Sequence, residues 1–578
     1  MRKLFRFLKG YRHFLVLGPL FKFIEAVFEL CIPIIVSRII DIGIKNQDSS
    51  YVMKMGVVLF ALAAAGLAFA LSAQYFAAVA QQGVGNRLRT SLFSHIGTLS
   101  CAELDRFGTA SLVTRLTNDV NQLQNAVAMF IRIVMRAPFL IIGSVFMSFM
   151  IDVQLALILC VVVPLILLTI YWIMSRSVPK FKKIQTLLDR ISTITRENLS
   201  GARVVRAFSA SDTEIKRFEE SSETLADASV RAGQLSALMN PLNSLIMNFG
   251  IIAVLWFGGL RVNAGNLSQG ETVALINYIT QIILALVAAS NLVITFTKAA
   301  ASAARVNEVF DTKSSVTDGS VSTVDFASAS NAIVFDHVSF AYSKKASPAV
   351  SDVSFSIKNG ETVGIIGGTG SGKTTLAALL MRQYDVDQGH IYVADRDIRE
   401  YDRNALYRNI SMVVQSPVII SGTVADNVRM GNEEIKDDNV EAALKTAMAW
   451  DFVSALPTGI HTHISRGGKN LSGGQKQRLS IARSLAVCPG ILILDDSFSA
   501  LDAATDYALR QNLKKELASS TVIMISQRIS SIRHLDHIIV VDDGHIVGEG
   551  THDELYQNCE VYHEIVLSQQ QGGEHSEK

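Results

Sequence analysis

The chain has 578 residues, of which 49% are hydrophobic and 18% are charged, and its formal net charge is +1. This length exceeds one compact domain, and a charged fraction below the roughly 25% of soluble proteins predicts that part of the chain lies in lipid. The near-zero net charge argues against a nucleic-acid-binding protein, which usually carries a basic surplus. The five cysteines lie far apart without metal-site spacing, and we interpret them as packing residues in a reducing compartment.

Six membrane-spanning helices are predicted, since a spanning helix needs about 20 predominantly apolar residues. Four stretches carry no charge at all, namely residues 56–86, 153–175, 232–260 and 272–297. A shorter stretch, 137–151, can extend over Arg132 and Arg136 if their head groups snorkel. The first span, 14–40, is atypical because Lys22, Glu25 and Glu29 interrupt it. The basic residues 1–13 lack the apolar core and cleavage site of a removable signal peptide.

Basic residues beside the spans predict the orientation. Five Lys or Arg and no acid lie in residues 2–12, and the segment 176–231 is also rich in basic residues. We therefore expect both termini, and the two long polar loops at 81–125 and 176–231, in the cytoplasm. These loops favour helix, and about 20 extra helical residues would reach about 30 Å beyond the bilayer, far enough to touch a soluble domain.

The three ionisable residues of the first span lie at i, i+3 and i+7, roughly on one helix face. An ionisable group at membrane depth is a functional candidate, so contact with a substrate or a cation is one interpretation. A Lys22–Glu25 pair that faces the bundle interior is the other.

A soluble domain follows the membrane region. Residues 311–331 are rich in Ser, Thr, Asp and Val and lack a helical period, so we interpret them as a linker. From residue 332, short β-rich runs alternate with helical stretches. The expected fold is an all-α membrane bundle of six helices with long cytoplasmic extensions over 1–310, joined by the linker to an α/β P-loop domain over 332–568 and a flexible tail over 569–578.

Residues 367–374 read GGTGSGKT and fit the phosphate-loop pattern GxxxxGK(S/T), between the β-rich run 361–366 and a helical stretch. Glycines let backbone N–H groups approach phosphate oxygens. Lys373 would supply positive charge to the β- and γ-phosphates, and the Thr374 hydroxyl would ligate Mg²⁺. The expected ATP contacts here are Gly367, Gly370, Ser371, Gly372, Lys373, Thr374 and Thr375.

The apolar run 491–494 reads as a buried strand, and two acids follow it. Asp495 at the strand end is placed to hold Mg²⁺ through water. Asp496 is the next carboxylate, and it would polarise the attacking water.

A third motif, LSGGQ at residues 471–475, lies upstream of that strand. Together with the phosphate loop it resembles the ATP-binding cassette transporter family, and with six spans ahead of it the chain resembles the half-transporter exporters of multidrug type. The resemblance covers nearly the whole chain. It implies that two cassettes pair head to tail, with each ATP between one chain's phosphate loop and Ser472, Gly473, Gly474 and Gln475 of the other.

The resemblance implies roles for further residues. Tyr342 resembles the aromatic residue that stacks on adenine. Gln415 resembles the Q-loop residue that touches Mg²⁺ and senses the membrane domain, and Asp502 resembles the D-loop acid that crosses between cassettes. Residues 104–119 and 201–208 resemble the two coupling segments of the membrane domain.

Three positions depart from the pattern of an active cassette. Asp496 stands where Glu is usual, so its carboxylate reaches one methylene less far. Gln527 stands where His is usual, and an amide carries no positive charge. Arg466 lies just before the signature, where exporters commonly show Glu.

These departures favour a heterodimer, in which a partner with the Glu and the His hydrolyses ATP against the intact signature of this chain. The alternative is a homodimer in which Asp496 and Gln527 still suffice. The resemblance implies ATP-driven export of hydrophobic or amphipathic small molecules, including drugs, across a bacterial cell membrane. Lipid or peptide translocation and a regulatory ATP-binding subunit are the competing functions.

Overall fold

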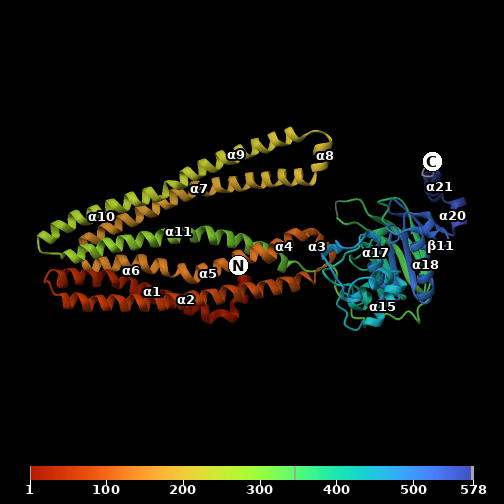
Figure 1. Cartoon of the computed structure of the whole chain (residues 1–578), viewed down its shortest axis with the longest axis horizontal. Helices are drawn as coiled ribbons and strands as arrows, with labels where there is room; N and C mark the ends of the chain where they lie inside the picture. The colour runs from red at the N-terminus through yellow and green to blue at the C-terminus, as the bar shows by residue number, and fades with distance from the viewer. Residues whose placement is uncertain (1, 344–345, 575–578) are drawn as a thin grey trace. The chain divides into compact units, whose positions relative to one another are not determined.

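The computed structural model describes residues 2–343 and 346–574, and the chain divides into two compact units. The first unit consists of Met1–His95 and Ala110–Asp311, and the second of Ile96–Thr109 and Thr312–Lys578. Figure 1 shows the first as a set of long helices and the second as a globular α/β fold. The short segment Ile96–Thr109 therefore belongs to the second unit although helices of the first unit flank it in the sequence.

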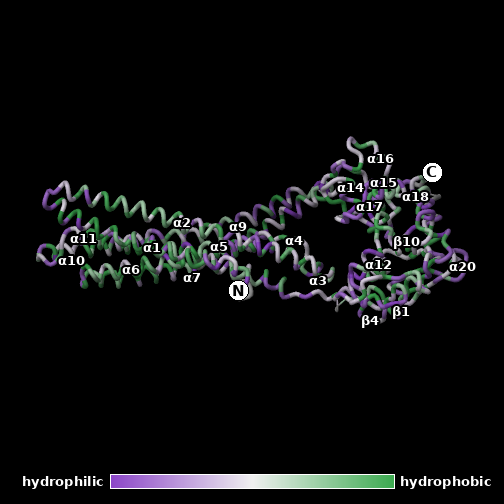
Figure 2. The backbone as a smooth tube through the Cα atoms, turned by 90° about the horizontal axis from the view of Figure 1, so that it is seen from below, coloured by the Kyte–Doolittle hydropathy of each residue, from purple (hydrophilic) through white to green (hydrophobic). Residues whose placement is uncertain are grey.

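The first unit is entirely helical in its described part. In chain order its helices are η1 (Arg2–Tyr11), α1 (Arg12–Arg38), η2 (Ile39–Ile44), α2 (Ser49–Ile96), α4 (Thr109–Thr114), η3 (Arg115–Asp119), α5 (Val120–Met129), η4 (Phe130–Val134), α6 (Arg136–Ile151), α7 (Val153–Ser200), α8 (Ala202–Ala207), α9 (Ser211–Ala237), α10 (Met239–Asn263) and α11 (Gln269–Asp311). Figure 2 shows hydrophobic residues gathered along α1, α6, α10 and α11.

Five helical segments of the described chain are long and apolar enough to cross a membrane: Ser49–Ile96, Thr109–Ile151, Val153–Ser200, Ser211–Asn263 and Gln269–Ala289. Helix α1 does not meet the same criterion because Lys22, Glu25 and Glu29 lie within it. It nevertheless packs into the bundle, where its buried Ala26 meets Ala137 and Leu140 of α6 and Ala285 of α11. Helix α1 is therefore the sixth, charged helix of the bundle.

The three charged residues in the middle of α1 are paired inside the bundle. Lys22 Nζ lies 2.6 Å from Glu25 Oε2, as the helical spacing suggests. Arg136 of α6, which the sequence did not connect to this group, lies 2.7 Å from Glu29 and 3.7 Å from Glu25. Two cations therefore neutralise two acids in a low-dielectric setting, where an unpaired charge would be costly.

Two long helices, α7 and α9, extend away from the apolar part of the bundle (Figure 1). Helix α7 has 48 residues, or about 70 Å at 1.5 Å per residue, which is more than twice a membrane span. It packs along α9, and α8 connects the two at their far end (Figure 1). Within α8 no residue is buried, and Phe208 next to it is 79% exposed.

The second unit is built on three sheets. Its strands are β1 (Asn331–Phe340), β2 (Val350–Lys358), β3 (Thr362–Ile366), β4 (Gln388–Val393), β5 (Arg396–Asp397), β6 (Ile410–Val413), β7 (Gly422–Thr423), β8 (His463–Ile464), β9 (Ile491–Asp495), β10 (Thr521–Ser526), β11 (His537–Asp542) and β12 (His545–Gly550). The largest sheet has the order β12-β11-β3-β10-β9-β6, and all its pairs are parallel except β11–β12.

The helices of this unit are α12 (Lys373–Leu380), α13 (Arg403–Asn409), α14 (Val424–Arg429), α15 (Asp437–Thr446), α16 (Trp450–Ser454), α17 (Gly473–Leu485), α18 (Ala503–Glu516), α19 (Ile529–Ile532), α20 (His552–Asn558) and α21 (Glu560–Glu574), with short turns η5 (Ile398–Glu400), η6 (Gly459–His461) and η7 (Arg466–Gly468). One face of the large sheet shares a core with α17 and α18, and the other shares a core with α12 and the strands β1, β2 and β4. Alternate residues of β9 enter two cores: Ile491 and Ile493 pack into one, and Leu492 and Leu494 into the other. Burial on both faces explains why this strand is uniformly apolar.

The second unit also holds α3 (Cys101–Phe107). A capping box of Ser100 and Glu103 begins this helix, which satisfies backbone N–H groups that a helix start leaves free. Glu103 also accepts from the backbone N–H of Ser315, at 3.2 Å. Burial raises the pKa of Glu103, but its hydrogen bonds with Ser100 and Ser315 outweigh this effect and lower it. At the other end of the chain α21 extends to Glu574, beyond the expected start of the tail at residue 569.

Candidate functional site

Three neighbouring parallel strands end at the same edge of the large sheet. Ser526 of β10 pairs with Ile366 of β3, and Ile525 of β10 pairs with Asp495 of β9. The phosphate loop, the segment after Asp495 and the segment with Gln527 therefore start side by side. Ligands of open α/β sheets bind at this carboxyl-end edge, so the strand order alone brings together three motifs that are up to 160 residues apart.

The phosphate loop leads from β3 into α12. Gly370 and Gly372 have φ of 85° and 103°, a left-handed conformation that favours glycine. A Cβ on Gly367 would lie 1.9 Å from the Val541 carbonyl oxygen, so this position also needs glycine. The buried Lys373 Nζ donates to the carbonyl oxygens of Gly367 and Gly368 and to Ser371 Oγ, at 3.0, 2.5 and 3.1 Å. The loop thus wraps around the ammonium group of Lys373.

The expected Mg²⁺ ligands Thr374 and Asp495 meet directly. Thr374 Oγ1 donates to Asp495 Oδ2 at 3.0 Å. Burial raises the pKa of Asp495, and the nearby Asp496 raises it further, while burial lowers the pKa of Lys373. Each group is thus placed where a charge of opposite sign would relieve its desolvation. Hydroxyl and carboxylate oxygens are ligands that Mg²⁺ accepts, so the residues fit a metal-bound nucleotide.

Asp496 follows the strand with a φ of 45°. Its backbone N–H donates to the Ile525 carbonyl oxygen at 2.9 Å. Gln415 Nε2 donates to Asp496 Oδ2 at 3.4 Å, and Thr369 Oγ1 donates to Gln527 Oε1 at 3.5 Å. The structure therefore gathers Gln415, Asp496 and Gln527 around the phosphate loop.

A residue of the C-terminal helix, Gln569, holds the segment that carries Gln527. Its side-chain Nε2 donates to the Gln527 carbonyl oxygen at 2.7 Å, and its Oε1 accepts from the Ile529 backbone N–H at 2.9 Å. The amide thus brackets this turn from both sides. Sequence reasoning missed Gln569 because no local motif connects it to residue 527.

Tyr342 presents a 54% exposed ring at the mouth of the site. Its hydroxyl lies 3.1 Å from Thr375 Oγ1. The Tyr384 ring contacts it edge-on, with centroids 5.3 Å apart and an interplanar angle of 88°. The Tyr384 hydroxyl donates to Asp105 of α3 at 2.5 Å, so one intervening ring connects Tyr342 to the first of the expected coupling segments.

These residues line one pocket of about 380 Å³. The sequence predicted ten of its lining residues: Tyr342, Gly370, Gly372, Lys373, Thr374, Thr375, Gln415, Asp495, Asp496 and Gln527. Ala349, Thr369, Ile525 and Ser526 line it without having been predicted. Gly367 and Ser371 do not line the pocket, but both accept hydrogen bonds from Lys373 Nζ. Ser472–Gln475 and Asp502 do not line this pocket.

The signature residues lie at the start of α17. Ser472 and Gln475 form a reciprocal capping box, in which the Ser472 N–H donates to Gln475 Oε1 at 2.8 Å and the Gln475 N–H donates to Ser472 Oγ at 3.3 Å. Asp502 caps α18 through its carboxylate, which accepts from the Thr505 N–H at 2.9 Å and from Thr505 Oγ1 at 2.8 Å. The exposed start of α17 suits an anion. Arg466, the third departing position, opens the turn η7 just before the signature.

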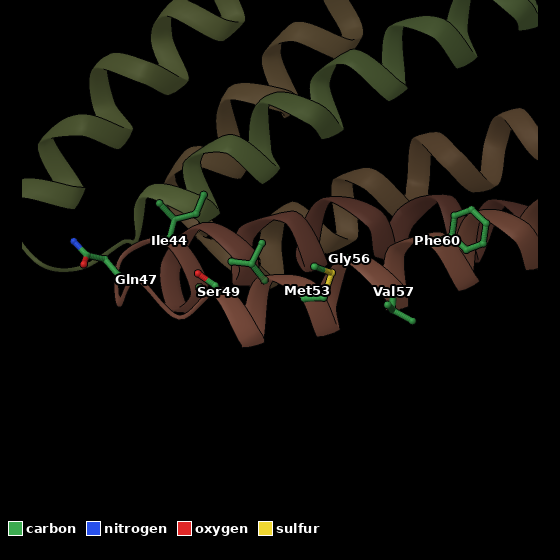
Figure 3. A pocket seen from close by; sticks show the side chains of 9 residues that line it. Ile44, Gln47, Ser49, Met53, Gly56, Val57 and Phe60 are labelled. Carbon is green, nitrogen blue, oxygen red and sulfur yellow. The ribbon is translucent and has the colours of Figure 1, made fainter.

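A larger pocket of about 760 Å³ lies at the turn between η2 and α2 of the membrane unit. Figure 3 shows Ile44, Met53, Val57 and Phe60 along it. None of its lining residues is acidic or basic, so it offers no charged side chain to a phosphate or a metal ion. Among the residues that the structure describes, no three His, Cys, Asp or Glu gather as a further metal site.

Two family models match successive parts of the chain. Residues 15–286 match the model of the ABC transporter transmembrane region, and residues 350–499 match the ABC transporter model. An ABC transporter ATP-binding protein of Bacillus subtilis, described as uncharacterized, is 36% identical over 570 residues, which cover 98% of each chain. A similarly described protein of Mycobacterium tuberculosis is 35% identical over 574 residues and 97% of each chain.

Two further comparisons concern substrate and fold. A fatty acid ABC transporter ATP-binding/permease protein of Mycobacterium bovis is 33% identical over 479 residues, or 83% of this chain and 75% of that protein. A solved structure of a bacterial Atm1-family ABC exporter with ATP bound has the same fold. It superposes with a TM-score of 0.79 at 23% identity and covers 98% of each chain.

Proposed function

Because the chain belongs to the ABC transporter family and carries a membrane region and an ATP-binding domain that couple ATP hydrolysis to transport, we propose that it is the weakly hydrolytic half of a heterodimeric exporter. The observation that carries the proposal is Asp496, with Gln527 beside it, in the pocket built by an otherwise complete phosphate loop. The partner would supply the glutamate and the histidine.

The reach of the general base decides between the two assemblies. A general base must lie within about 2.6–3.2 Å of the water that it activates. Asp496 is one methylene shorter than Glu, and its carboxylate accepts from Gln415 at 3.4 Å. Gln527 can donate a hydrogen bond to the γ-phosphate but cannot neutralise its charge. A homodimer would contain two such sites.

The rest of this site fits ATP. Lys373 Nζ, which now satisfies loop carbonyl oxygens, would turn to the β- and γ-phosphates, and the loop N–H groups would cradle them. Thr374, Asp495 and Gln415 would hold Mg²⁺, which when bound neutralises charge that develops on the phosphates. The Tyr342 ring would stack on adenine. We therefore expect this site to hold ATP and to hydrolyse it slowly.

The signature half of this chain would serve the partner. Ser472–Gln475 would close over ATP bound to the partner's phosphate loop, and the partner's carboxylate would take a proton from the attacking water as the β–γ bridging bond breaks. Asp502 would cross between the cassettes. The α3 segment, and α8 at the exposed tip of α7 and α9, would transmit cassette closure to the membrane helices and shift the pore between inward- and outward-facing states.

Export of hydrophobic or amphipathic molecules from the cytoplasm is the function that the apolar bundle supports best. We place the protein in the bacterial inner membrane with both termini in the cytoplasm, because basic residues flank the cytoplasmic ends of the spans. Lipid translocation is the second candidate, and the similarity to a fatty acid transporter favours it.

The test compares ATPase rates of the purified chain alone and with its partner half-transporter. We expect slow turnover alone and brisk turnover in the pair. Asp496→Asn should leave the rate of the pair nearly unchanged. Brisk turnover of the chain alone, abolished by Asp496→Asn, would establish a homodimer instead. Transport of a fluorescent dye by the pair in vesicles then tests the export of amphipathic molecules.

A further inference from the structure

An apolar pocket of about 480 Å³ lies within the membrane unit, between α1, α2, α5 and α11. Ten of its eleven lining residues are apolar, and the other is Arg12. Small-molecule sites usually have about 300–1,000 Å³ and a mostly apolar lining with few polar groups. The lining includes Leu15, Val84, Leu123, Phe130 and Phe296. Its size and its single charge set it apart from the charged pocket of the second unit.

The pocket lies where the apolar stretches of three helices give way to basic residues. Arg12 begins α1. The charge-free stretch of α2 ends after Val84 and is followed by Arg87, and that of α11 ends just after Phe296 and is followed by Lys298. Such a transition marks the boundary between hydrocarbon and the cytoplasmic interface. A ligand here would have its apolar part at membrane depth and its polar part near water.

The walls of the pocket are packed against neighbouring helices. Leu88 and Val84 of α2 are 2% and 3% exposed, and Ala299 of α11 is fully buried. Phe130 begins the π-helical turn η4, and such turns often mark functional positions in helices. A pocket of this volume suits one apolar chain and is small for the two chains of a phospholipid.

The charge of the lining selects for an anion. No acidic residue lines the pocket. The neighbouring cations Arg6 and Arg87 contact aromatic rings, with Arg87 4.9 Å from the centroid of Tyr11. By contrast, the Arg12 side chain makes no hydrogen bond, ion pair or ring contact with any side chain that the structure describes. Its guanidinium group is exposed and offers a planar pair of donors that matches a carboxylate.

We propose that this pocket binds the chain of a single-chain amphipathic anion, a long-chain carboxylate, with the carboxylate against Arg12. The inference rests on the proposed export of amphipathic molecules and names the class of substrate and the place where it enters from the inner leaflet. Burial of the chain supplies the affinity, and the arginine supplies the discrimination between an anion and a cation.

The test uses the full-length chain in phosphatidylcholine nanodiscs, because the pocket lies within one chain. The probe is palmitate with a photoreactive diazirine group, and labelled peptides are mapped by mass spectrometry. We expect labelling of peptides from α1, α5 and α11. Arg12→Gln should weaken saturable labelling about fivefold, a modest effect because an exposed charge contributes less than a buried one. Arg12→Lys keeps the charge but lacks the planar pair of donors, so its loss should be smaller than that of Arg12→Gln.

The matched control is Lys9→Gln, which removes one nearby exposed cation that does not line the pocket and should leave labelling unchanged. Equal losses in Lys9→Gln and Arg12→Gln would overturn the proposal, as would equal competition by hexadecyltrimethylammonium or phosphatidylglycerol against palmitate. Absent labelling in a complex that still exports dye would reject the pocket and leave the proposed function intact. Labelling without any ATP-dependent transport would reject the proposed function alone.

Discussion

The two halves of the nucleotide machinery in this chain differ in how they are built. The phosphate-loop half needs side chains from Lys373, Gln415, Asp495 and Gln527 to converge at one sheet edge, so its activity depends on the reach of each. The signature half is one helix start, which the Ser472–Gln475 capping box holds locally. The loss of one methylene at Asp496 could therefore impair the phosphate-loop half while the signature half stays intact. This difference would let one chain combine the proposed weak site with an intact signature.

The largest effect is expected from a substitution in the signature half. In the complex with the partner, Ser472→Arg should lower the ATPase rate about a hundredfold, because it blocks donors aimed at the phosphate of the partner's ATP, and losing such donors costs about 10²–10³ in rate. Steady-state phosphate release measures the effect, and size-exclusion chromatography verifies assembly. Asp496→Asn in the same complex is the matched control. If both variants lose activity equally, the two halves contribute equally to ATP hydrolysis and the proposed difference is wrong.

A smaller effect is expected from substitutions that restore the usual residues of the phosphate-loop half. Asp496→Glu combined with Gln527→His should raise the turnover of this chain alone at least about tenfold, since a positioned general base contributes about 10²–10⁴. Single-turnover hydrolysis of radiolabelled ATP measures it. Asp496→Asn with Gln527→His retains the new histidine but lacks a base, and it should stay slow. An unchanged rate in the repaired variant would locate the defect elsewhere.

The smallest expected effect concerns the bracket around Gln527. Gln569→Ala removes both hydrogen bonds that hold this turn, so ATP should bind about two- to fivefold more weakly, in line with one or two modest hydrogen bonds. Titration with a fluorescent ATP analogue measures the affinity, and Gln569→Glu should restore only the bond from the Ile529 N–H. The neighbouring Gln570→Ala is the control. If the thermal midpoint falls while affinity stays constant, Gln569 only stabilises the fold.

Motifs that act through local geometry were predictable from the sequence. The phosphate loop needs glycines at positive φ, and Gly370 and Gly372 have it. The Lys22–Glu25 pair follows from a spacing of three residues in a helix. Contacts between distant segments were not predictable: Arg136 reaches Glu29 across two helices, and Gln569 reaches Gln527 from the C-terminal helix. No periodicity or local motif encodes either contact.

The sequence by itself determined the residue types and their spacing: the glycine-rich loop before Lys373, the apolar stretches of the membrane helices, and an aspartate, Asp496, after the strand 491–495. These properties depend on side-chain type and on spacing along one element. Only the tertiary structure decided which groups meet. The parallel order β3-β10-β9 aligns three distant motifs, packing draws residues 96–109 into the second unit, and the bundle leaves an apolar pocket beside Arg12. Such contacts depend on how whole elements pack, which no short stretch of sequence specifies.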